Sequence, residues 1–252
     1  MISKNKLKLI RSLAKKKYRE KEKLFLTEGD KNVLEVLTSN FVVRELFATP
    51  EFLFQHAQIT KKARLTIEVG PDEIKKASLL QTPQNCLALC EIPQPGTYHP
   101  ALKGLVFYFD GIQDPGNLGT IIRTCDWFGI DEIFCSADTV DFYNPKVIQA
   151  TMGSFCRVRV LETEFTSIAT AAKKAQVPIY GSFMDGNSVY SQNLPENALV
   201  VLGNEGNGIR PETENMIDWK ISIPSFSNSG TESLNVGVAA GIICSEFKRR
   251  LI

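Results

Sequence analysis

Three polar loops, each placed after an apolar stretch, hold the residues of this 252-residue chain that could do chemistry. In the segment DGIQDPGNLGTIIRT at 110–124, a Pro115-Gly116 turn precedes Asn117, and Arg123 follows on a predicted helix. Asn117 at a helix start can cap the helix and fix the loop, while the Arg123 guanidinium can bind a phosphate or a developing oxyanion. The same segment also fits a capped helix that carries a surface arginine.

The second loop, in LVVLGNEGNGI at 199–209, is rich in glycine. Three glycines within six residues allow the backbone to approach a ligand closely. Glu205 is the only charged residue between Gly203 and Ile209, so we expect it to orient Arg123 or a substrate hydroxyl. The alternative role of Glu205 is that of a loop carboxylate paired with a nearby amide.

The third loop, in ISIPSFSNSGTESLNVGVAAGI at 221–242, joins a short strand to a helix of small residues. Ser233 and Asn235 flank Leu234 at the start of this helix, where both polar side chains can act as caps. Small residues along the helix permit close packing against another helix, for which a helix of a partner subunit is one candidate.

Several common site chemistries find no support. The two histidines, His56 and His99, lie outside any metal-ligand or triad context, which disfavours a zinc hydrolase or a Ser-His-Asp enzyme. No GxxxxGK[ST] occurs, and GNEGNG at 203–208 is not GxGxxG, so P-loop and dinucleotide sites are disfavoured too. The remaining loops of Asn, Ser and Gly can hold a polar cofactor through backbone amides.

The charge is unevenly distributed along the chain. Residues 1–23 contain ten Lys or Arg and two Glu, a net charge of +8, whereas the other 229 residues sum to −7. A basic arm on an acidic body indicates contact with a polyanion, although a solvated lysine-rich helix face explains the run equally well. The six cysteines include no CxxC pair, which favours reduced thiols and a cytoplasmic location. No apolar run approaches the ~18 residues that a membrane span needs.

The elements that must position these loops alternate between helix and strand, which indicates an α/β fold. The segment IPQPGTYHP at 92–100 has linker composition, so we place one domain at 1–95 and a second at 104–252. In the first domain we predict helices at 4–23 and from residues 29, 50 and 71, with strands at 24–27, 42–48, 65–69 and 86–91. In the second we predict helices at 116–128 and 235–250, with strands at 104–110, 132–135, 155–160, 178–183, 198–203 and 220–223.

Together the three loops resemble the SpoU (TrmH-type) family of RNA ribose 2′-O-methyltransferases. The chain carries the family's three motifs in order, as N(x5)R within QDPGNLGTIIRT, the LGNEGNG loop, and IP…SLNV. The segment FLTEGDKNVLEVL at 25–37 is similar to an accessory RNA-binding domain of the ribosomal-protein L30e type. The stretch SFSNSGTE before Ser233 is longer than is common in the family, so the contacts of residues 225–231 do not carry over.

The resemblance implies an α/β methyltransferase domain with a parallel sheet and a deep trefoil knot, where S-adenosylmethionine binds and no metal is needed. It implies cofactor contacts at Gly203, Ile223 and Leu234. The catalytic positions that match are Asn117, Arg123, Glu205, Ser233 and Asn235. It also implies a homodimer in which Arg123 of one subunit can serve the other's site.

The expected substrate is RNA, with ribosomal RNA (23S) preferred over transfer RNA because an extra N-terminal RNA-binding domain accompanies many rRNA-directed members of the family. The main alternative is a non-enzymatic RNA-binding or ribosome-assembly factor on the same fold. An oxidoreductase on a Rossmann-like sheet is disfavoured by the missing glycine fingerprint.

Overall fold

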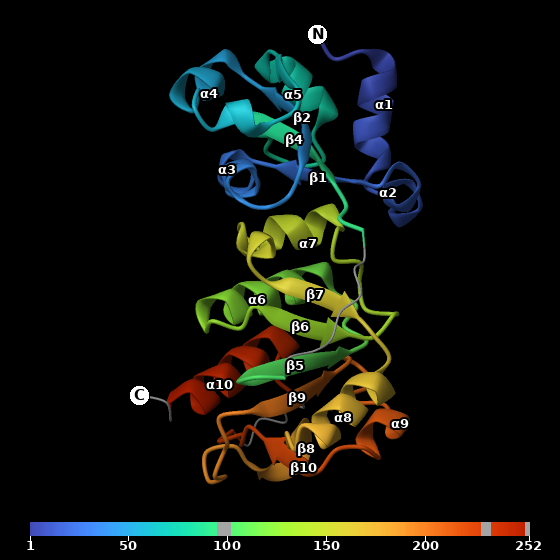
Figure 1. Cartoon of the computed structure of the whole chain (residues 1–252), viewed down its shortest axis with the longest axis vertical. Helices are drawn as coiled ribbons and strands as arrows, with labels where there is room; N and C mark the ends of the chain where they lie inside the picture. The colour runs from blue at the N-terminus through green and yellow to red at the C-terminus, as the bar shows by residue number, and fades with distance from the viewer. Residues whose placement is uncertain (95–101, 228–232, 250–252) are drawn as a thin grey trace. The chain divides into compact units, whose positions relative to one another are not determined.

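The computed structural model describes residues 1–94, 102–227 and 233–249, and the chain divides into two compact units (Figure 1). The first unit comprises Met1–Gly96 together with Asp141–Arg157, and the second comprises Thr97–Val140 and Val158–Ile252. Residues 141–157, which the sequence analysis places in the domain 104–252, therefore pack with the N-terminal unit.

The first unit is a four-stranded mixed sheet with helices on both faces. Its strand order is β1-β4-β2-β3, with β4 antiparallel to β1 and β2, and β3 parallel to β2. The strands are β1 (Leu24–Glu28), β2 (Val43–Ala48), β3 (Thr66–Glu68) and β4 (Cys86–Glu91). The helices are α1 (Lys4–Ser12), α2 (Lys16–Glu22), α3 (Asp30–Thr38), α4 (Pro50–Gln55), α5 (Pro71–Ala77) and α7 (Pro145–Ala150).

Alternate side chains of β1 enter two different cores, as the pleat of a strand requires. Leu24 and Leu26 pack in one apolar cluster with Ile10 of α1 and Ile74 of α5. Phe25 points the other way, into a cluster that contains residues of α3 and α4 as well as Ile148 and Phe155. The segment 141–157 is therefore part of the N-terminal core.

The predicted helix at 4–23 is two helices in the structure. The helix is interrupted after Leu13. The backbone carbonyl of Leu13 accepts a hydrogen bond of 2.7 Å from the Arg19 guanidinium. Arg19 is buried and also pairs with the carboxylate of Asp141. The sequence pattern of residues 4–23 does not predict this break, because nothing in it distinguishes the buried Arg19 from the exposed cations around it.

The second unit is a six-stranded sheet in which all pairs are parallel, with the order β10-β8-β9-β5-β6-β7. This confirms the predicted α/β fold class with a parallel sheet and a smaller N-terminal α/β domain. The strands are β5 (Leu105–Asp110), β6 (Glu132–Cys135), β7 (Arg159–Glu162), β8 (Ile179–Ser188), β9 (Ala198–Gly203) and β10 (Trp219–Ser222). The helices are α6 (Pro115–Trp127), α8 (Phe165–Lys174), α9 (Pro211–Glu214) and α10 (Val236–Arg249).

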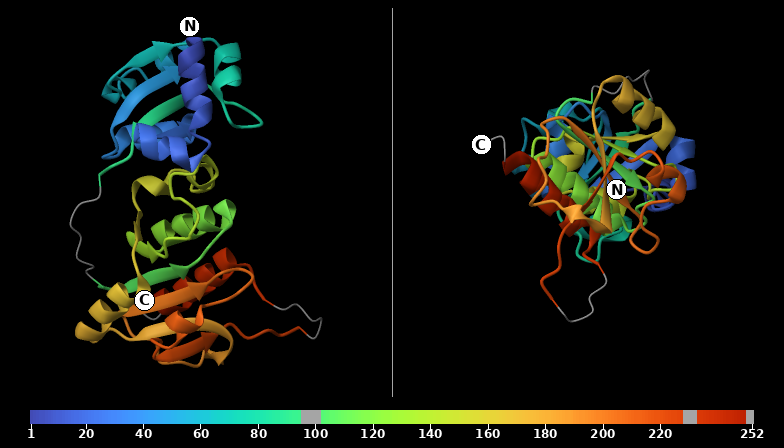
Figure 2. Two further views of the ribbon diagram at one scale, coloured as in Figure 1. Left: turned by 90° about the vertical axis from the view of Figure 1, so that its right-hand side faces the viewer. Right: turned by 90° about the horizontal axis from the view of Figure 1, so that it is seen from below.

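Within this unit, α6 and α10 lie side by side on one face of the sheet and α8 covers the other (Figure 1, Figure 2). A Cβ atom added at Gly237 of α10 would lie 3.2 Å from Thr120 Cγ2 of α6, and one at Gly241 would lie 3.9 Å from Thr124 Cγ2. The small residues of α10 thus serve close packing against a helix of the same chain. A partner helix is not needed to explain them.

Some predicted elements differ from the structure. The predicted strand at 155–160 is a 3₁₀ turn at Ser154–Cys156 followed by the shorter strand β7, and α7, α8 and α9 were not predicted. The knot expected from the resemblance involves the loop before α10, of which residues 228–232 lie outside the described residues. No helix within 1–94, 102–227 or 233–249 is long and apolar enough to cross a membrane.

Candidate active site

The site is built at the carboxyl edge of the parallel sheet, where β5 and β9 end side by side. Asp110 at the end of β5 pairs in register with Gly203 at the end of β9. The loops after these strands, 111–114 and 204–210, therefore start next to each other. Loops at this edge are where open parallel sheets bind their ligands.

The α6 helix begins in a way that leaves the Asn117 side chain available. Asp114 is the N-cap, and its carboxylate accepts the backbone N–H of Asn117 at 2.8 Å. The expectation that Asn117 itself caps the helix is thus wrong, since the preceding aspartate does so. The Asn117 amide donates to Glu205 Oε1 at 2.9 Å, and its oxygen accepts from Asn235 Nδ2 at 2.7 Å.

Glu205 is held at the start of α6. Besides Asn117, the backbone N–H groups of Gln113 and Asp114 donate to its carboxylate, at 3.3 and 3.4 Å. A helix N-terminus carries partial positive charge and unsatisfied N–H groups, so it favours a carboxylate. Glu205 therefore fastens the loop after β9 to the helix after β5.

The loop from Gly203 to Gly208 closes tightly on itself. Asn204 and Gly208 exchange backbone hydrogen bonds of 2.9 and 3.0 Å, and a Cβ atom at Gly203 would lie 2.1 Å from the Gly208 carbonyl carbon. The Asn204 side chain accepts the N–H groups of Gly206 and Asn207 and donates to the Gly111 carbonyl at 2.7 Å. Only glycine fits at 203, and the loop is held by hydrogen bonds within itself and by one to Gly111.

The third motif enters the site through its last residues. Asn235 accepts the N–H groups of Gly237 and Val238, at 2.9 and 3.3 Å, and so caps α10. Its amide reaches Asn117, which places the start of α10 two hydrogen bonds from Glu205. Ile223 is half-buried after β10, and Ser233 and Leu234 are exposed. Part of the loop 225–231 lies outside the described residues.

Arg123 is exposed on α6 and lies apart from this network. Among the described residues, none forms a hydrogen bond or an ion pair with its guanidinium. The expectation that Glu205 orients Arg123 therefore differs from the structure, because the Glu205 carboxylate accepts from Asn117, whose amide oxygen in turn accepts from Asn235. The structure thus gathers Asn117, Glu205 and Asn235, and it leaves the Arg123 side chain available to a ligand.

Three charged residues beside the loops were missed by the sequence analysis. The Arg210 guanidinium lies 3.0 Å from Asp110 Oδ1 and 2.6 Å from Asp138 Oδ1. Desolvation raises the pKa of Asp138, but hydrogen bonds from Ser136 and Arg210 outweigh it and leave that pKa below its usual value. The available signal was a lone carboxylate, Asp110, that ends the otherwise apolar run LVFYFD.

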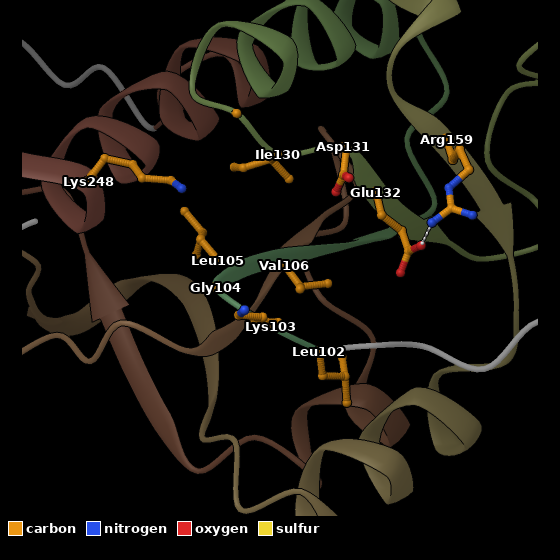
Figure 3. Close-up of a pocket in the computed structure, with 11 residues that line it drawn as sticks. Leu102, Lys103, Gly104, Leu105, Val106, Ile130, Asp131, Glu132, Arg159 and Lys248 are labelled. Atoms are coloured by element: carbon orange, nitrogen blue, oxygen red, sulfur yellow. Dashed lines mark hydrogen bonds and ion pairs between the residues drawn. The ribbon is translucent and has the colours of Figure 1, made fainter.

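Metal-ligating groups and a pocket away from this cluster are the other possible parts of a site. No group of three or more His, Cys, Asp or Glu among the described residues is arranged to hold a metal ion. A pocket of about 280 Å³ at the amino ends of β5 and β6 contains none of the predicted site residues (Figure 3). It lies at the opposite edge of the sheet from Asn117 and Glu205, and its Glu132 and Arg159 side chains form an ion pair of 2.8 Å.

Comparison with known proteins assigns both units. The SpoU rRNA Methylase family model matches residues 104–245. The 23S rRNA (guanosine(2553)-2′-O)-methyltransferase RlmP of Bacillus subtilis is 31% identical over 243 residues, which cover 94% of each protein. This chain belongs to the SpoU rRNA methylase family. Residues 4–88 of this SpoU family member match the MRM3-like substrate binding domain.

Solved structures resemble this SpoU family member over nearly its whole length. A putative RNA methyltransferase of the TrmH family from Porphyromonas gingivalis has a TM-score of 0.88 and 38% identity, with 99% of both chains covered. The AdoMet-bound rRNA methyltransferase from Sinorhizobium meliloti has a TM-score of 0.87 and 26% identity, covering 100% of this chain and 98% of the other. The family predicted from the three motifs is confirmed, as is S-adenosylmethionine as its cofactor.

The loops of this SpoU family member suit an adenosine-bearing cofactor. Residues 205–208 are exposed, and no N–H group of the described residues donates to the carbonyls of Glu205, Gly206 or Asn207. These carbonyls can accept hydrogen bonds from the amine and hydroxyl groups of S-adenosylmethionine. Leu234, with 48% of its surface exposed, offers an apolar face for a ring.

Proposed function

We propose that this protein transfers a methyl group from S-adenosylmethionine to a ribose 2′-OH in ribosomal RNA. The observation that carries the proposal is the hydrogen-bonded chain from Asn235 through Asn117 to Glu205, which joins all three motifs into one site. Because RlmP and the RlmB relatives are named as guanosine methyltransferases of 23S rRNA, we propose guanosine in that RNA as the target.

Within the proposed mechanism, bound S-adenosylmethionine supplies a methyl group that is already activated toward nucleophiles. The protein must then orient the ribose hydroxyl and favour its alkoxide. We assign the electrostatic part to Arg123, whose guanidinium stays protonated and has no competing partner among the described residues. Because a protonated guanidinium cannot accept the hydroxyl proton, removal by Arg123 itself would need its neutral form, and a substrate phosphate is the alternative acceptor.

Asn117, Glu205 and Asn235 act in this proposal by holding the loops together. Gly203, Ile223 and Leu234 hold the cofactor, largely through backbone groups, and Ser233 shapes the same loop. Asn117 offers both halves of its amide to the network, so it orders the helix that carries Arg123 and the loop that carries Glu205. A site assembled before substrate arrives loses less entropy at the reaction step.

The proposed homodimer is supported by two exposed apolar side chains, one on α6 and one on α10. Trp127 is 86% exposed and Val238 is 51% exposed, although large apolar side chains usually avoid water. Arg123 lies one helical turn before Trp127 on α6 and so belongs to the same face. A subunit that covered this face would place Arg123 beside the interface, where it could serve the partner's site.

The proposed RNA-binding surface lies on the N-terminal unit. Eight of the ten cations in residues 1–23 are exposed, and the other two, Lys6 and Arg19, are used in ion pairs with Glu45 and Asp141. The exposed set is Lys4, Lys8, Arg11, Lys15, Lys16, Lys17, Lys21 and Lys23. Such a set binds phosphates in a salt-dependent way.

The proposed location is the cytoplasm, where the protein would encounter ribosomal RNA.

Methyl transfer to fractionated RNA tests the proposal. Labelled S-adenosylmethionine is incubated with the protein and with unmodified rRNA or tRNA, and the label in each fraction is counted. We expect label in rRNA, and none with the Arg123→Ala variant as the matched control. Label confined to tRNA would overturn the assigned substrate. Cofactor binding without transfer to RNA or to ribosomal particles would favour the RNA-binding factor instead.

A further inference from the structure

We propose that Asp110 and Arg210 are positioning residues that fix the loop 203–209 in its cofactor-binding shape. This inference rests on the proposed function of that loop. It assigns a role to the ion pair between the buried carboxylate of Asp110 and the half-exposed Arg210, which lies outside the three motifs' matching positions. Neither residue is placed against the reacting atoms, so neither is a catalytic residue.

The Asp110 carboxylate contacts both the backbone and the side chain of Arg210. Its carboxylate accepts the Arg210 backbone N–H at Oδ2, at 3.0 Å, and faces the Arg210 guanidinium at Oδ1, also at 3.0 Å. Asp110 is only 1% exposed, and its Oδ1 accepts no hydrogen bond from the described residues. The guanidinium is therefore the group that compensates this buried charge, and its loss leaves a carboxylate in a poorly solvated place.

The backbone contact matters because of where Arg210 sits. It follows the Gly203–Ile209 loop directly, while Asp110 ends the strand that pairs with Gly203. Both ends of the loop are thus tied to the end of β5, one by sheet pairing and one by the Asp110 carboxylate. A loop closed at both ends has fewer conformations to lose when a ligand binds.

The Arg210 side chain also contacts a second loop, the one that follows β6. Its Nη2 donates to Asp138 Oδ1 at 2.6 Å and to Ser136 Oγ at 3.2 Å, both of which follow β6. It crosses over Gly111, where a Cβ atom would lie 3.1 Å from Nη2 and where φ is +82°. The Gly111 carbonyl in turn accepts from the Asn204 side-chain amide, so the Arg210 guanidinium and a side chain of the 203–209 loop both contact this glycine.

A chain of contacts then leads to Glu205. The Gln113 side chain donates to the Asp138 carbonyl at 2.6 Å, and the Gln113 backbone N–H donates to Glu205. Arg210, Asp138 and Gln113 thus form a chain of contacts to Glu205 that does not pass through Asn117. Displacement of Arg210 is expected to loosen Glu205 and the exposed carbonyls of 205–207 together.

The test compares Asp110→Asn, Arg210→Gln, Arg210→Lys and the double variant Asp110→Asn/Arg210→Gln with the wild type. Cofactor affinity is measured by calorimetry with S-adenosylmethionine and no RNA, and backbone hydrogen exchange is followed by peptide. Glu132→Gln is the matched control, because Glu132 is also a mostly buried carboxylate in an arginine pair, but at the other edge of the sheet (Figure 3).

We expect Arg210→Gln to weaken cofactor binding about tenfold, because it leaves the buried Asp110 carboxylate without its charged partner, with faster exchange in residues 203–209 and in the 136–138 loop that Arg210 also holds. Arg210→Lys should recover part of the affinity, and the double variant should be no weaker than the worse single one. Glu132→Gln should leave the affinity unchanged.

Two results would overturn the assignment. One is unchanged cofactor affinity and unchanged loop exchange in Arg210→Gln and Asp110→Asn, while the wild type binds S-adenosylmethionine. The other is an equal loss of affinity in Glu132→Gln, which would mean that general stability is responsible. Failure of the wild type itself to bind S-adenosylmethionine would contradict the proposed function and the positioning role together, so the two failures are distinguishable.

Discussion

The amide of Asn117 and the carboxylate of Glu205 are joined by a hydrogen bond of 2.9 Å, although 88 residues separate them in the chain. The bond spans two loops that follow neighbouring parallel strands, and Asn235 extends it to a third segment. Three motifs that look unrelated along the sequence are therefore one hydrogen-bonded unit. The geometry explains why an asparagine suits position 117, since its amide both donates to Glu205 and accepts from Asn235.

Replacement of Asn117 by Asp tests this unit directly. The variant would place a second carboxylate against Glu205 and remove the donor, so the two loops should repel each other. We expect at least about a hundredfold loss of methyl transfer, on the scale of a lost positioning contact. Steady-state kinetics with rRNA measure it, with the exposed Asn215→Asp as control. Unchanged kcat/KM for Asn117→Asp would separate Asn117 from the site.

The glycines of the cofactor loop should respond unequally to alanine. At Gly203 a Cβ atom would lie 2.1 Å from the Gly208 carbonyl carbon, whereas at Gly206 its nearest neighbour is Asn204 Oδ1 at 3.6 Å. Gly203→Ala should therefore abolish measurable S-adenosylmethionine binding, and Gly206→Ala should change the affinity by no more than about threefold. Calorimetric titration of both variants checks this. Equal effects at the two positions would contradict the loop geometry.

Arg123→Ala should separate chemistry from folding. The side chain is exposed and makes no polar contact with the described residues, so its removal should shift the free energy of unfolding by no more than about 0.5 kcal/mol. Transfer should be lost while S-adenosylmethionine affinity stays within a factor of about two, since Arg123 is not among the loops that hold the cofactor. A large loss of cofactor affinity would move Arg123 into the cofactor pocket.

The basic arm should govern the salt dependence of RNA binding. Lys15, Lys16 and Lys17 are exposed, so Lys→Gln changes at all three should weaken rRNA binding without unfolding the unit. The slope of log affinity against log salt should become shallower by up to about 2 to 3, as each phosphate contact contributes about 0.7–0.9. Lys61, Lys62 and Lys75, exposed elsewhere on the same unit, form the control set. Equal slopes for both sets would leave the arm as a solvated surface.

This charge change is a cleaner test than removal of residues 1–95. Ile148 and Phe155 share a core with the N-terminal strands, so truncation would expose apolar surface on the remaining chain. Reduced activity of a truncated protein would then report damage to the fold as much as lost RNA contacts.

Glu28 should make the stability of the first unit depend on pH. Burial raises the pKa of this carboxyl, although hydrogen bonds from the Ser78 hydroxyl and the Leu79 N–H oppose the shift. The folded state therefore holds the proton more tightly than the unfolded chain, and the stabilisation present at low pH is lost as pH rises through the raised pKa. Glu28→Gln should flatten this dependence above about pH 4.3.

Thermal unfolding of the full chain across that pH range measures the effect, with the exposed Glu68→Gln as control. The wild type and Glu68→Gln should lose stability in parallel as pH rises, while Glu28→Gln should not follow them. Superimposable profiles for all three proteins would contradict a buried, proton-binding Glu28.

Sequence reasoning predicted the elements that carry strong local signals. Pro50 and Pro71 open helices at their first positions, and β9 was placed at its observed bounds by a run of apolar residues. The predictions failed where a tertiary contact decides the structure. The break after Leu13 depends on the buried Arg19, whose partner Asp141 is 122 residues away, and α7 belongs to a core formed by distant strands.

The candidate site divides in the same way. Residue types and spacing indicated Asn117, Glu205 and Asn235 as polar groups of loops after strands, and the parallel register of β5 and β9 brings two of these loops together. The sequence did not predict which side chains bond to each other. It expected Glu205 to orient Arg123, and it overlooked Arg210, because a pair formed across one hundred residues has no local pattern.

The identity of the methylated nucleoside tests the central claim most directly. Unmodified 23S rRNA is incubated with the wild-type protein and S-adenosylmethionine, digested to nucleosides and analysed by mass spectrometry, with Arg123→Ala processed in parallel. We predict a gain of 2′-O-methylguanosine in the wild-type sample alone. A methyl group on a base, or a gain of the same size with Arg123→Ala, would contradict the proposed ribose chemistry and its assignment to this site.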